Sequence, residues 1–567
     1  MAVWQSLSKR FDRKLFIFFL CVILPFALLP LALSDYQETK CSYVILLVAC
    51  YWLLEPVSIA VTSLLPVVLF PGLGIISSSD VCSNYMKEAF MMIIGSLIMA
   101  VALEECRLHE RIALKILMWV GSDIKWVMMG FMLTTMFLSM WVSNTATTAL
   151  MVPIVDAILE KLQPLKQTNM HLKGLNLDCP SDPSLMERKQ NDEDEEVADD
   201  KVHHLEESST LKVTLLLSVC YSANIGGTGT LTGTAPNLVL KGLMDVLHPE
   251  SNEITFASWM FYNIPGMLIC VFIGWLYLWM VFIKFSKSNL NVSKEDIKDI
   301  ISKRYADLGR LTIQEAQVMI LFLILIFLWV FRDPKIINGW MDALGTKRKI
   351  GDSAPAMAIA FLLFFLPSDI RNPKSKKLFD WKTVQAKLPW GLILLLGGGF
   401  ALADGAQKSG LSKIIGEKLA SLQVLPPIAV VAVLCFMTTM ITEIVSNTST
   451  ANILLPVFSQ MALAIGVNPL SIMLPVSVVC SYAFMLPVAT PPNAIAFDSG
   501  NMKTIQMAKP GIVMNIVCCA VQILMINTLG VALFDLNNFP SWANSTKTFD
   551  PKLLLTFNAS LNTSSTL

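Results

Sequence analysis

Long apolar stretches separated by polar segments run along almost the whole chain. The first extends from Leu15 to about Leu33. The others lie at about 42–73, 89–103, 126–158, 211–246, 254–284, 314–331, 354–367, 388–404, 426–466, 470–498 and 507–535. A helix of roughly 20 apolar residues crosses the ~30 Å hydrocarbon core of a bilayer. Several stretches have double length or are broken by Gly, Pro and Asn, so the pattern predicts an all-α polytopic membrane protein with about 11 transmembrane helices.

The composition excludes a soluble domain. Of the 567 residues, 54% are hydrophobic and 15% are charged, whereas roughly a quarter of the residues of a soluble domain are charged. Lys plus Arg and Asp plus Glu both number 43, so the zero net charge gives no support for a nucleic-acid partner. The twelve Cys include no C-x-x-C pair, which indicates neither a disulfide framework nor a zinc site. No nucleophile–base pair or metal cluster is visible at membrane depth, so we do not expect an enzyme.

Charged segments between the apolar stretches predict the orientation of the chain. Residues 1–14 are basic and the segments 285–312 and 368–388 carry Lys clusters, and basic flanks favour the cytosolic side of the membrane. The acidic segment 160–210 is predicted to be a cytosolic loop, because its composition cannot bury a core. We expect a multi-pass plasma-membrane protein with a cytosolic N-terminus and an extracellular, glycosylated tail at 536–567. The sequons of this tail are Asn544, Asn558 and Asn562.

The chain contains an internal repeat. Shifted by 303 residues, the segment 142–153 aligns with 445–456, and six of the twelve positions are identical. A second motif recurs at 233–237 and 489–493 with an offset of 256. The two offsets differ by 47 residues, about the length of the acidic loop, so the first half carries an insertion.

The orientation of the two halves defines the kind of repeat. If 285–312 is a cytosolic linker and each half has about five spans, equivalent segments enter the membrane from opposite sides. This is an inverted-topology repeat, an architecture of secondary transporters. The first span and first repeat would cover 15–284, and the second repeat would cover 313–535.

Each half holds a Ser-Asn-Thr triplet near the middle of an apolar stretch, 126–158 in the first half and 426–466 in the second. Both stretches are longer than a single transmembrane helix needs. Short hydrogen-bonding side chains cap helix ends, so each stretch is predicted to be a re-entrant helical hairpin with the triplet at its tip. Hydrogen bonding between helices would be the better explanation of a single triplet, but two copies in register favour the hairpins. Glu443 is interpreted as an acceptor for backbone N–H groups at the tip, with proton relay as the alternative.

Two further motifs break apolar stretches with Gly and Pro, at 225–237 and 488–493. Broken helices free backbone carbonyls, and these oxygens together with Ser, Thr and Asn oxygens suit Na⁺. The N-termini of half-helices favour an anion. No Lys or Arg occurs in the four motifs, so sodium itself would supply the positive charge for the anion, and the two would bind interdependently.

The chain resembles the divalent anion/sodium symporters, the family of sodium-coupled di- and tricarboxylate and sulfate transporters, over about 15–545. The likeness rests on the paired triplets and on LTGTAPN at 231–237, LLGGGFALA at 395–403 and FMLPVATPPNA at 484–494. Within this family, the chain most resembles the animal carboxylate branch that includes the INDY transporters. The resemblance implies a homodimer in which a mobile transport domain moves against a fixed scaffold, an elevator-type mechanism.

The resemblance also implies a set of site residues. The substrate contacts would be Ser143, Asn144, Thr145, Gly227, Ser446, Asn447, Thr448 and Thr490. The first sodium ion would lie among Ser139, Ser143, Asn144, Gly226 and Gly227. The second would lie among Thr442, Ser446, Asn447, Ala489 and Pro491. Thr448 stands where mammalian carboxylate members often have Val, a difference that bears on substrate preference.

Residues and resemblance together predict a sodium-coupled symporter of di- and tricarboxylates such as succinate and citrate, with Na⁺ as the co-transported ion. Two alternatives on the same fold are a sodium-coupled sulfate symporter and a cation-independent carboxylate exchanger. The residue sequence Ser-Asn-Thr-Ala-Thr-Thr of the first motif favours a carboxylate substrate over sulfate.

Overall fold

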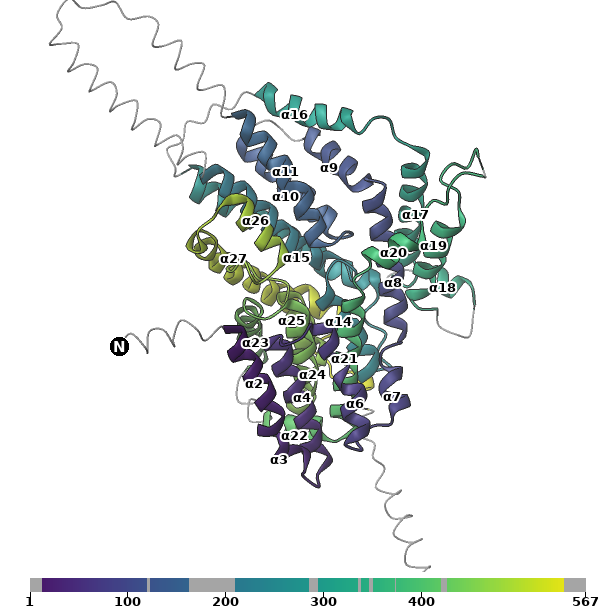
Figure 1. The fold of residues 1–567 in the computed structure, drawn as a ribbon, viewed down its shortest axis with the longest axis vertical. Coiled ribbons are helices and arrows are strands. Elements are labelled where there is room, and N and C mark those ends of the chain that lie inside the picture. Colours follow the sequence, from purple (N-terminus) through teal and green to yellow (C-terminus); the bar gives the residue numbers. More distant parts are fainter. Residues whose placement is uncertain are drawn as a thin grey trace, which may run out of the picture.

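The chain folds into helices (Figure 1). The computed structural model describes residues 13–119, 123–162, 210–284, 294–334, 338–345, 350–372, 374–419 and 426–544. Within these ranges the β pairing is limited to an isolated antiparallel bridge between Pro367 and Lys377. Six helical segments of the described chain are long and apolar enough to cross a membrane: Ser78–Glu105, Phe256–Phe282, Ile313–Val330, Trp390–Lys408, Asn447–Ile465 and Thr504–Phe534. The predicted all-helical membrane fold is thereby confirmed, whereas most of the acidic loop lies outside the described residues.

Two pairs of helices have the hairpin form that the triplets predict. The first pair is α10 (Ile124–Ser139) and α11 (Asn144–Leu162), and the second is α23 (Pro427–Thr442) and α24 (Asn447–Ile465). The members of each pair contact one another. At a rise of about 1.5 Å per residue, the 16 residues of α10 or α23 are shorter than a ~30 Å hydrocarbon core. In Figure 1 the first pair lies in the upper half of the molecule and the second in the lower half.

Two other helices are interrupted near the middle of the molecule. A helix over 210–226 ends in the 3₁₀ turn η1 (Gly227–Gly229), and the chain continues as α14 (Ala235–Leu247). In the second half, α25 (Pro469–Val479) is followed by an irregular segment and then by α26 (Pro491–Gly500). Both α14 and α26 begin with Pro in their first two positions, where the missing N–H costs no hydrogen bond. Gly and Pro thus set the position of each break.

The remaining helices surround these elements. The longer ones are α4 (Gln37–Leu54), α8 (Glu88–Glu105), α15 (Phe256–Leu278), α17 (Ile313–Val330), α19 (Ser353–Phe365), α21 (Trp390–Lys408) and α27 (Thr504–Met525). The shorter ones are α2 (Arg13–Ala27), α3 (Leu29–Ala32), α5 (Ile59–Thr62), α6 (Leu65–Gly72), α7 (Ser78–Ser83), α18 (Trp340–Ala343), α22 (Leu411–Leu419), α28 (Val531–Phe534) and α29 (Ser541–Asn544). The π-helical turns η2 (Trp279–Lys284) and η4 (Ile526–Gly530) extend α15 and α27.

Buried apolar side chains form two clusters. The smaller cluster joins α4, α6 and one face of α21, with Trp52 and Phe70 at its centre. The larger cluster holds the two hairpins, the two broken helices and the opposite face of α21, including Phe400. In a bilayer, close packing and interhelical hydrogen bonds stabilise such contacts, because lipid tails are as apolar as the side chains. The helix α21 is therefore the shared wall between the two clusters.

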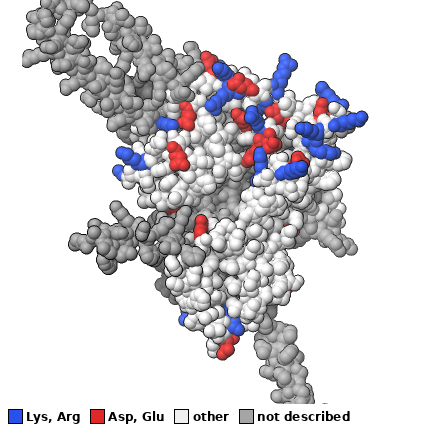
Figure 2. All heavy atoms as spheres, viewed as in Figure 1, with Lys and Arg blue, Asp and Glu red and all other residues white. Residues whose placement is uncertain are grey.

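Charged side chains gather at one end of the molecule (Figure 2), where Figure 1 places α9 (Leu108–Trp119), α16 (Lys294–Asp307) and α20 (Trp381–Lys387). Arg111 of α9 is 7% exposed and pairs with Glu315 of α17 at 3.2 Å. Its guanidinium also donates to the carbonyls of Leu308 and Gly309, at 3.1 and 3.0 Å. A buried Arg needs such complete pairing, and here it holds the turn between α16 and α17 against α9.

Candidate functional site

The first triplet brings three oxygen atoms together where α11 begins. The hydroxyl of Ser139, at the end of α10, lies 2.6 Å from Asn144 Oδ1 and 2.7 Å from the carbonyl oxygen of Ala223. A hydroxyl has one hydrogen to donate, so it satisfies one of these two acceptors at a time. The other acceptor receives no hydrogen from this hydroxyl, and a cation placed among the three oxygens would balance their negative partial charges.

The second triplet reproduces this arrangement. The hydroxyl of Thr442, at the end of α23, lies 2.9 Å from Asn447 Oδ1 and 2.7 Å from the carbonyl oxygen of Cys480. Thr442 and Asn447 occupy the positions of Ser139 and Asn144 in the repeat. The same hydroxyl–amide–carbonyl set therefore occurs once at each hairpin, each time against the broken helix of its own half.

An Asn after each break holds the freed carbonyls in place. The amide of Asn237 donates to the carbonyls of Gly227 and Thr230, at 3.1 and 2.8 Å. The amide of Asn493 donates to the carbonyls of Ala483 and Leu486, at 3.0 and 2.9 Å. Each Asn thus bridges carbonyls seven and ten residues before it. Since buried carbonyls are costly without partners, this Asn stabilises both irregular segments in the same way.

The first break approaches its hairpin so closely that only Gly fits. A Cβ on Gly227 would lie 2.6 Å from Asn144 Oδ1, and a Cβ on Gly226 would lie 2.5 Å from the Met136 carbonyl oxygen. At Gly226 the Cβ would meet backbone, so any other residue there would push the break away from α10, and at Gly227 it would displace the Asn144 amide. Gly226 and Gly227, both predicted as sodium ligands, can lie beside α10 and α11 because they have no Cβ.

The two broken helices also contact each other. The amide of Asn224 donates to Asn493 Oδ1 at 3.1 Å and to Thr490 Oγ1 at 3.3 Å. Earlier in the second helix, Ser477 donates to the carbonyl of Pro236, which lies later in the first, at 3.0 Å. A position later in the first helix thus meets one earlier in the second, so the two broken helices run antiparallel past each other. Their breaks lie in one region of the molecule.

Glu443 supports the second break. Its carboxyl oxygens accept hydrogen bonds from the backbone N–H groups of Phe484, Met485 and Leu486 at 2.8–3.1 Å, and from the Asn515 amide at 2.6 Å. The side chain is 3% exposed. The interpretation of Glu443 as an acceptor for backbone N–H groups is confirmed, but these groups belong to the facing break and not to the tip of its own hairpin.

Four helix N-termini adjoin the two sets. Two of them, α11 and α24, begin at the triplets, and the Oγ atoms of Ser143 and Ser446 accept from Ala146 N at 3.2 Å and from Ser449 N at 3.4 Å. The other two, α14 and α26, begin after Thr234 and Thr490. Helix N-termini present N–H groups and a positive dipole end to anions. The breaks therefore combine oxygen ligands with N–H donors.

The predicted substrate residues differ in accessibility. Ser143 and Thr145 are exposed, as is Pro491 among the predicted sodium ligands. The side chains of Asn144, Ser446, Asn447 and Thr448 are half-buried, whereas Gly226, Gly227, Ala489 and Thr490 are buried. Hydrogen bonds join Ser139 to Asn144 and Thr442 to Asn447, and the ligand roles of these residues stay predictions. The backbone of Asn544 ends α29, and Asn558 and Asn562 lie outside the described residues.

Sequence reasoning missed five residues that build the site. Ala223 and Cys480 contribute carbonyls, and the amides of Asn224, Asn237 and Asn493 contribute hydrogen bonds. The recurrence of Pro-Asn at the same place in both halves was a usable signal for Asn237 and Asn493. The side chains of Ala223 and Cys480 carry no signal, because only their backbone takes part.

The donor set has the chemistry of a hard-cation site. Hydroxyl, amide and carbonyl oxygens are hard ligands, which suit Na⁺ rather than a soft metal. Among the described residues no group of three His, Cys, Asp or Glu could hold a metal ion. The fold and these paired oxygen sets are those of an ion-coupled membrane transporter.

Comparison with known proteins agrees with this class. Residues 9–536 match the model of the family described as the sodium:sulfate symporter transmembrane region. The chain is 40% identical to the Na(+)/citrate cotransporter of Rattus norvegicus, with 95% of this chain and 99% of the relative covered. It is 39% identical to solute carrier family 13 member 2 of Homo sapiens, with 96% and 97% covered. It is 38% identical to the Na(+)/dicarboxylate cotransporter 3 of Rattus norvegicus, with 96% and 97% covered.

The chain belongs to this family of sodium-coupled anion symporters. The family resemblance that the triplets indicated is confirmed over nearly the whole chain.

Proposed function

We propose that the protein is a sodium-coupled symporter of di- and tricarboxylates such as succinate and citrate. Relatives that cover nearly the whole chain are named for citrate and dicarboxylate cotransport with Na⁺. The observation that carries the proposal is the duplicated set of three oxygens, Ser139–Asn144–Ala223 and Thr442–Asn447–Cys480. Each set has one hydroxyl proton for two acceptor oxygens, so one acceptor oxygen lacks a donor. A bound cation would take the place of that donor.

Each oxygen set forms the core of one proposed sodium site. The first site uses Ser139, Ser143, Asn144, Gly226 and Gly227, and we add the carbonyl of Ala223 because it contacts the Ser139 hydroxyl. The second uses Thr442, Ser446, Asn447, Ala489 and Pro491, and we add the carbonyl of Cys480 because it contacts the Thr442 hydroxyl. The Asn amide has two ends, so its oxygen can face sodium while its NH₂ group donates to a carboxylate.

The substrate would lie between the two triplets. Its carboxylates would contact Ser143, Asn144, Thr145, Gly227, Ser446, Asn447, Thr448 and Thr490. None of these side chains is cationic, so the N–H groups at the helix N-termini and the two sodium ions would supply the positive potential. The anion would then bind weakly without sodium, and this dependence couples the two fluxes.

The arrangement of the helices supports an inverted repeat and an elevator-type movement. The two hairpins lie in opposite halves of the molecule (Figure 1), and the two broken helices run antiparallel. In the proposed mechanism, the hairpins and broken helices move together relative to the helices around α4, α6 and α21. We further propose a homodimer in the plasma membrane, with the charged end of Figure 2 in the cytosol and the C-terminus outside.

Uptake of labelled substrates tests the proposed function. Cells expressing the protein would receive radiolabelled succinate, citrate or sulfate, in sodium medium and in medium with choline in its place. We expect uptake of succinate or citrate that falls to the level of untransfected cells in choline. Undiminished uptake in choline would identify a carboxylate exchanger, and sodium-dependent uptake of sulfate alone would identify a sulfate symporter.

A further inference from the structure

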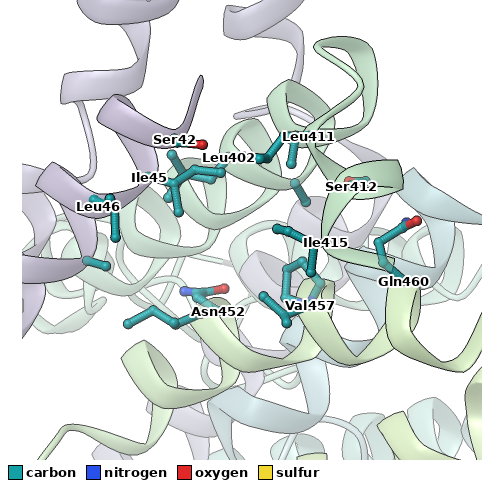
Figure 3. A pocket seen from close by; sticks show the side chains of 15 residues that line it. Ser42, Ile45, Leu46, Leu402, Leu411, Ser412, Ile415, Asn452, Val457 and Gln460 are labelled. Atoms are coloured by element: carbon teal, nitrogen blue, oxygen red, sulfur yellow. The ribbon is translucent and has the colours of Figure 1, made fainter. Parts of the chain in front are cut away.

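A cavity of about 240 Å³ lies between the second hairpin and three helices outside it. Its walls are α4, α21, α22 and α24, which lie side by side in the lower half of Figure 1. In Figure 3 the purple helix α4 faces the green helices α22 and α24 across the cavity. The cavity follows the seam between the two apolar clusters, since Leu402 and Ala406 of its wall belong to the smaller cluster and Ala403 to the larger.

Each wall contributes one stripe of a helix surface. On α4 the lining residues are Ser42, Ile45, Leu46 and Ala49, the spacing that places side chains on one helical face. On α24 they are spaced in the same way and include Val457. Four helices thus present a coherent surface to one space, which distinguishes the cavity from a local packing defect.

Most of the lining is apolar, and its polar side chains are Ser42, Ser412, Asn452 and Gln460 (Figure 3). An apolar cavity of roughly 150 Å³ is known to bind a hydrocarbon such as benzene, and the mostly apolar lining here offers water few hydrogen-bond partners. Leaving it empty would forfeit dispersion contacts along four helices. The cavity is therefore suited to an apolar occupant.

The cavity reaches the apolar surface of the molecule, where lipid can meet it. Leu46, on its wall, is 45% exposed at the outer face of α4, so the space reaches the surface of the molecule. At the other end Leu402 and Ala406 are only 6% and 7% exposed. A space that runs from an exposed apolar side chain to buried residues can be entered by a flexible chain from the bilayer.

We propose that this cavity is a binding site for one acyl chain of a membrane phospholipid, between α24 and the helices α4, α21 and α22. The chain would contact the helix that begins at the second triplet. Occupancy would thus link the lipid to the element that carries half of the proposed sodium and substrate sites. Binding of the chain and its test do not depend on transport, so the proposal can fail while the proposed function stands.

Photolabelling tests the proposal. The full-length protein is reconstituted into liposomes that contain phosphatidylcholine with a diazirine in its acyl chain, irradiated, and mapped by mass spectrometry. Lipid at the surface labels exposed residues such as Leu46 in any case. We expect additional label on Leu402 or Ala406, which only an inserted chain can reach.

Filling the cavity should remove this additional label. Val457→Phe places a ring in the space, and we expect loss of label on Leu402 and Ala406 while label on exposed residues remains. Val433→Phe is the matched control, because it makes the same change on the exposed surface of α23 and should leave the label intact. Ala49→Phe fills the cavity from the opposite wall and replaces Val457→Phe if that variant does not fold.

Two outcomes would overturn the proposal. The first is the absence of label on Leu402 and Ala406 in the unmodified protein, or its persistence in both filling variants. The second is efficient disulfide cross-linking of two protomers through Leu46→Cys without label at the buried residues, which would assign the opening to a second copy of the chain.

Discussion

At the scale of single residues, the site depends on hydrogen-bonding groups used by more than one partner. Asn144 and Asn447 each accept at Oδ1 from a hydroxyl that also contacts a backbone carbonyl. Glu443 accepts from three consecutive N–H groups and an amide. Because each of these side chains takes part in several hydrogen bonds, removing one side chain breaks several hydrogen bonds together.

The variants Asn144→Ala and Asn447→Ala should each reduce sodium-dependent uptake of succinate or citrate to background. Either change removes the proposed sodium ligand and the proposed carboxylate donor in one step. Surface biotinylation alongside the uptake assay shows whether the protein reaches the membrane. Asn527→Ala, at an exposed position of η4, is the control that should retain uptake. Near-normal uptake by either triplet variant would show that its Asn is structural only.

Replacing Glu443 by Gln should lower the stability of the protein. The amide keeps one acceptor oxygen but turns an NH₂ group toward N–H donors, and hydrogen bonds to charged groups are worth about 1.5–3 kcal/mol each. We expect a lower Tm in a thermal unfolding assay of the purified protein. Glu105→Gln is the control, because its ion pair with Lys387 is exposed and such pairs contribute about 0–1 kcal/mol. Equal Tm values for both variants would contradict the role of Glu443.

At the scale of elements, the breaks in the two helices place backbone oxygens beside the hairpins. The first break depends on Gly226 and Gly227, which leave no space for a Cβ beside α10 and α11. The second break has no such Gly, and the carboxyl group of Glu443 holds it instead. Equivalent elements of the two halves therefore share the bridging Asn but differ in what else holds the break in place.

Gly226→Ala should abolish uptake and lower surface expression, because its Cβ would lie 2.5 Å from the Met136 carbonyl oxygen. The backbone there cannot give way without separating the break from α10. Gly72→Ala is a matched control at the end of α6, since a Cβ on Gly72 meets nothing within 4 Å. Uptake and surface expression are measured together, and an active Gly226→Ala variant would show that the close approach is not required.

At the scale of the whole molecule, the opposite ends differ in charge. Lys and Arg gather where α9, α16 and α20 lie, and the other end carries few charged side chains (Figure 2). Along α8, Glu105 lies at the charged end of the molecule, where it pairs with Lys387, whereas Glu88 at the opposite end of the helix accepts from Ser353. Basic residues favour the cytosolic side, so α7 at the start of this segment should face the outside.

Cysteine labelling tests this orientation. Cys82 on α7 is exposed, so a membrane-impermeant maleimide should label it on intact cells, and Cys82→Ser should remove that label. In the Cys82→Ser background, Lys376→Cys should react only after the cells are permeabilised. The reverse pattern would overturn the orientation and with it the inverted repeat, whereas uptake assays would be unaffected.

The membrane class, the repeat and the triplets could be derived from the sequence, because apolar length and the residues that interrupt helices are local properties. The hairpins coincide with helix pairs divided at Ser139–Asn144 and Thr442–Asn447. The breaks follow Gly and Pro, which end helices wherever they are placed. Residues recurring at a constant offset identified the Asn amide of both oxygen sets, and the family resemblance identified their hydroxyls, Ser139 and Thr442.

The carbonyls of Ala223 and Cys480, the target of Glu443 and the cavity beside α24 depended on the fold. A backbone carbonyl is the same group in every residue, so no side chain in the sequence marks which carbonyl becomes a ligand. Glu443 bonds to N–H groups about forty residues away, and the cavity joins four helices that are not all consecutive in the chain. Such relations arise only when distant segments pack together, and for this reason local patterns do not contain them.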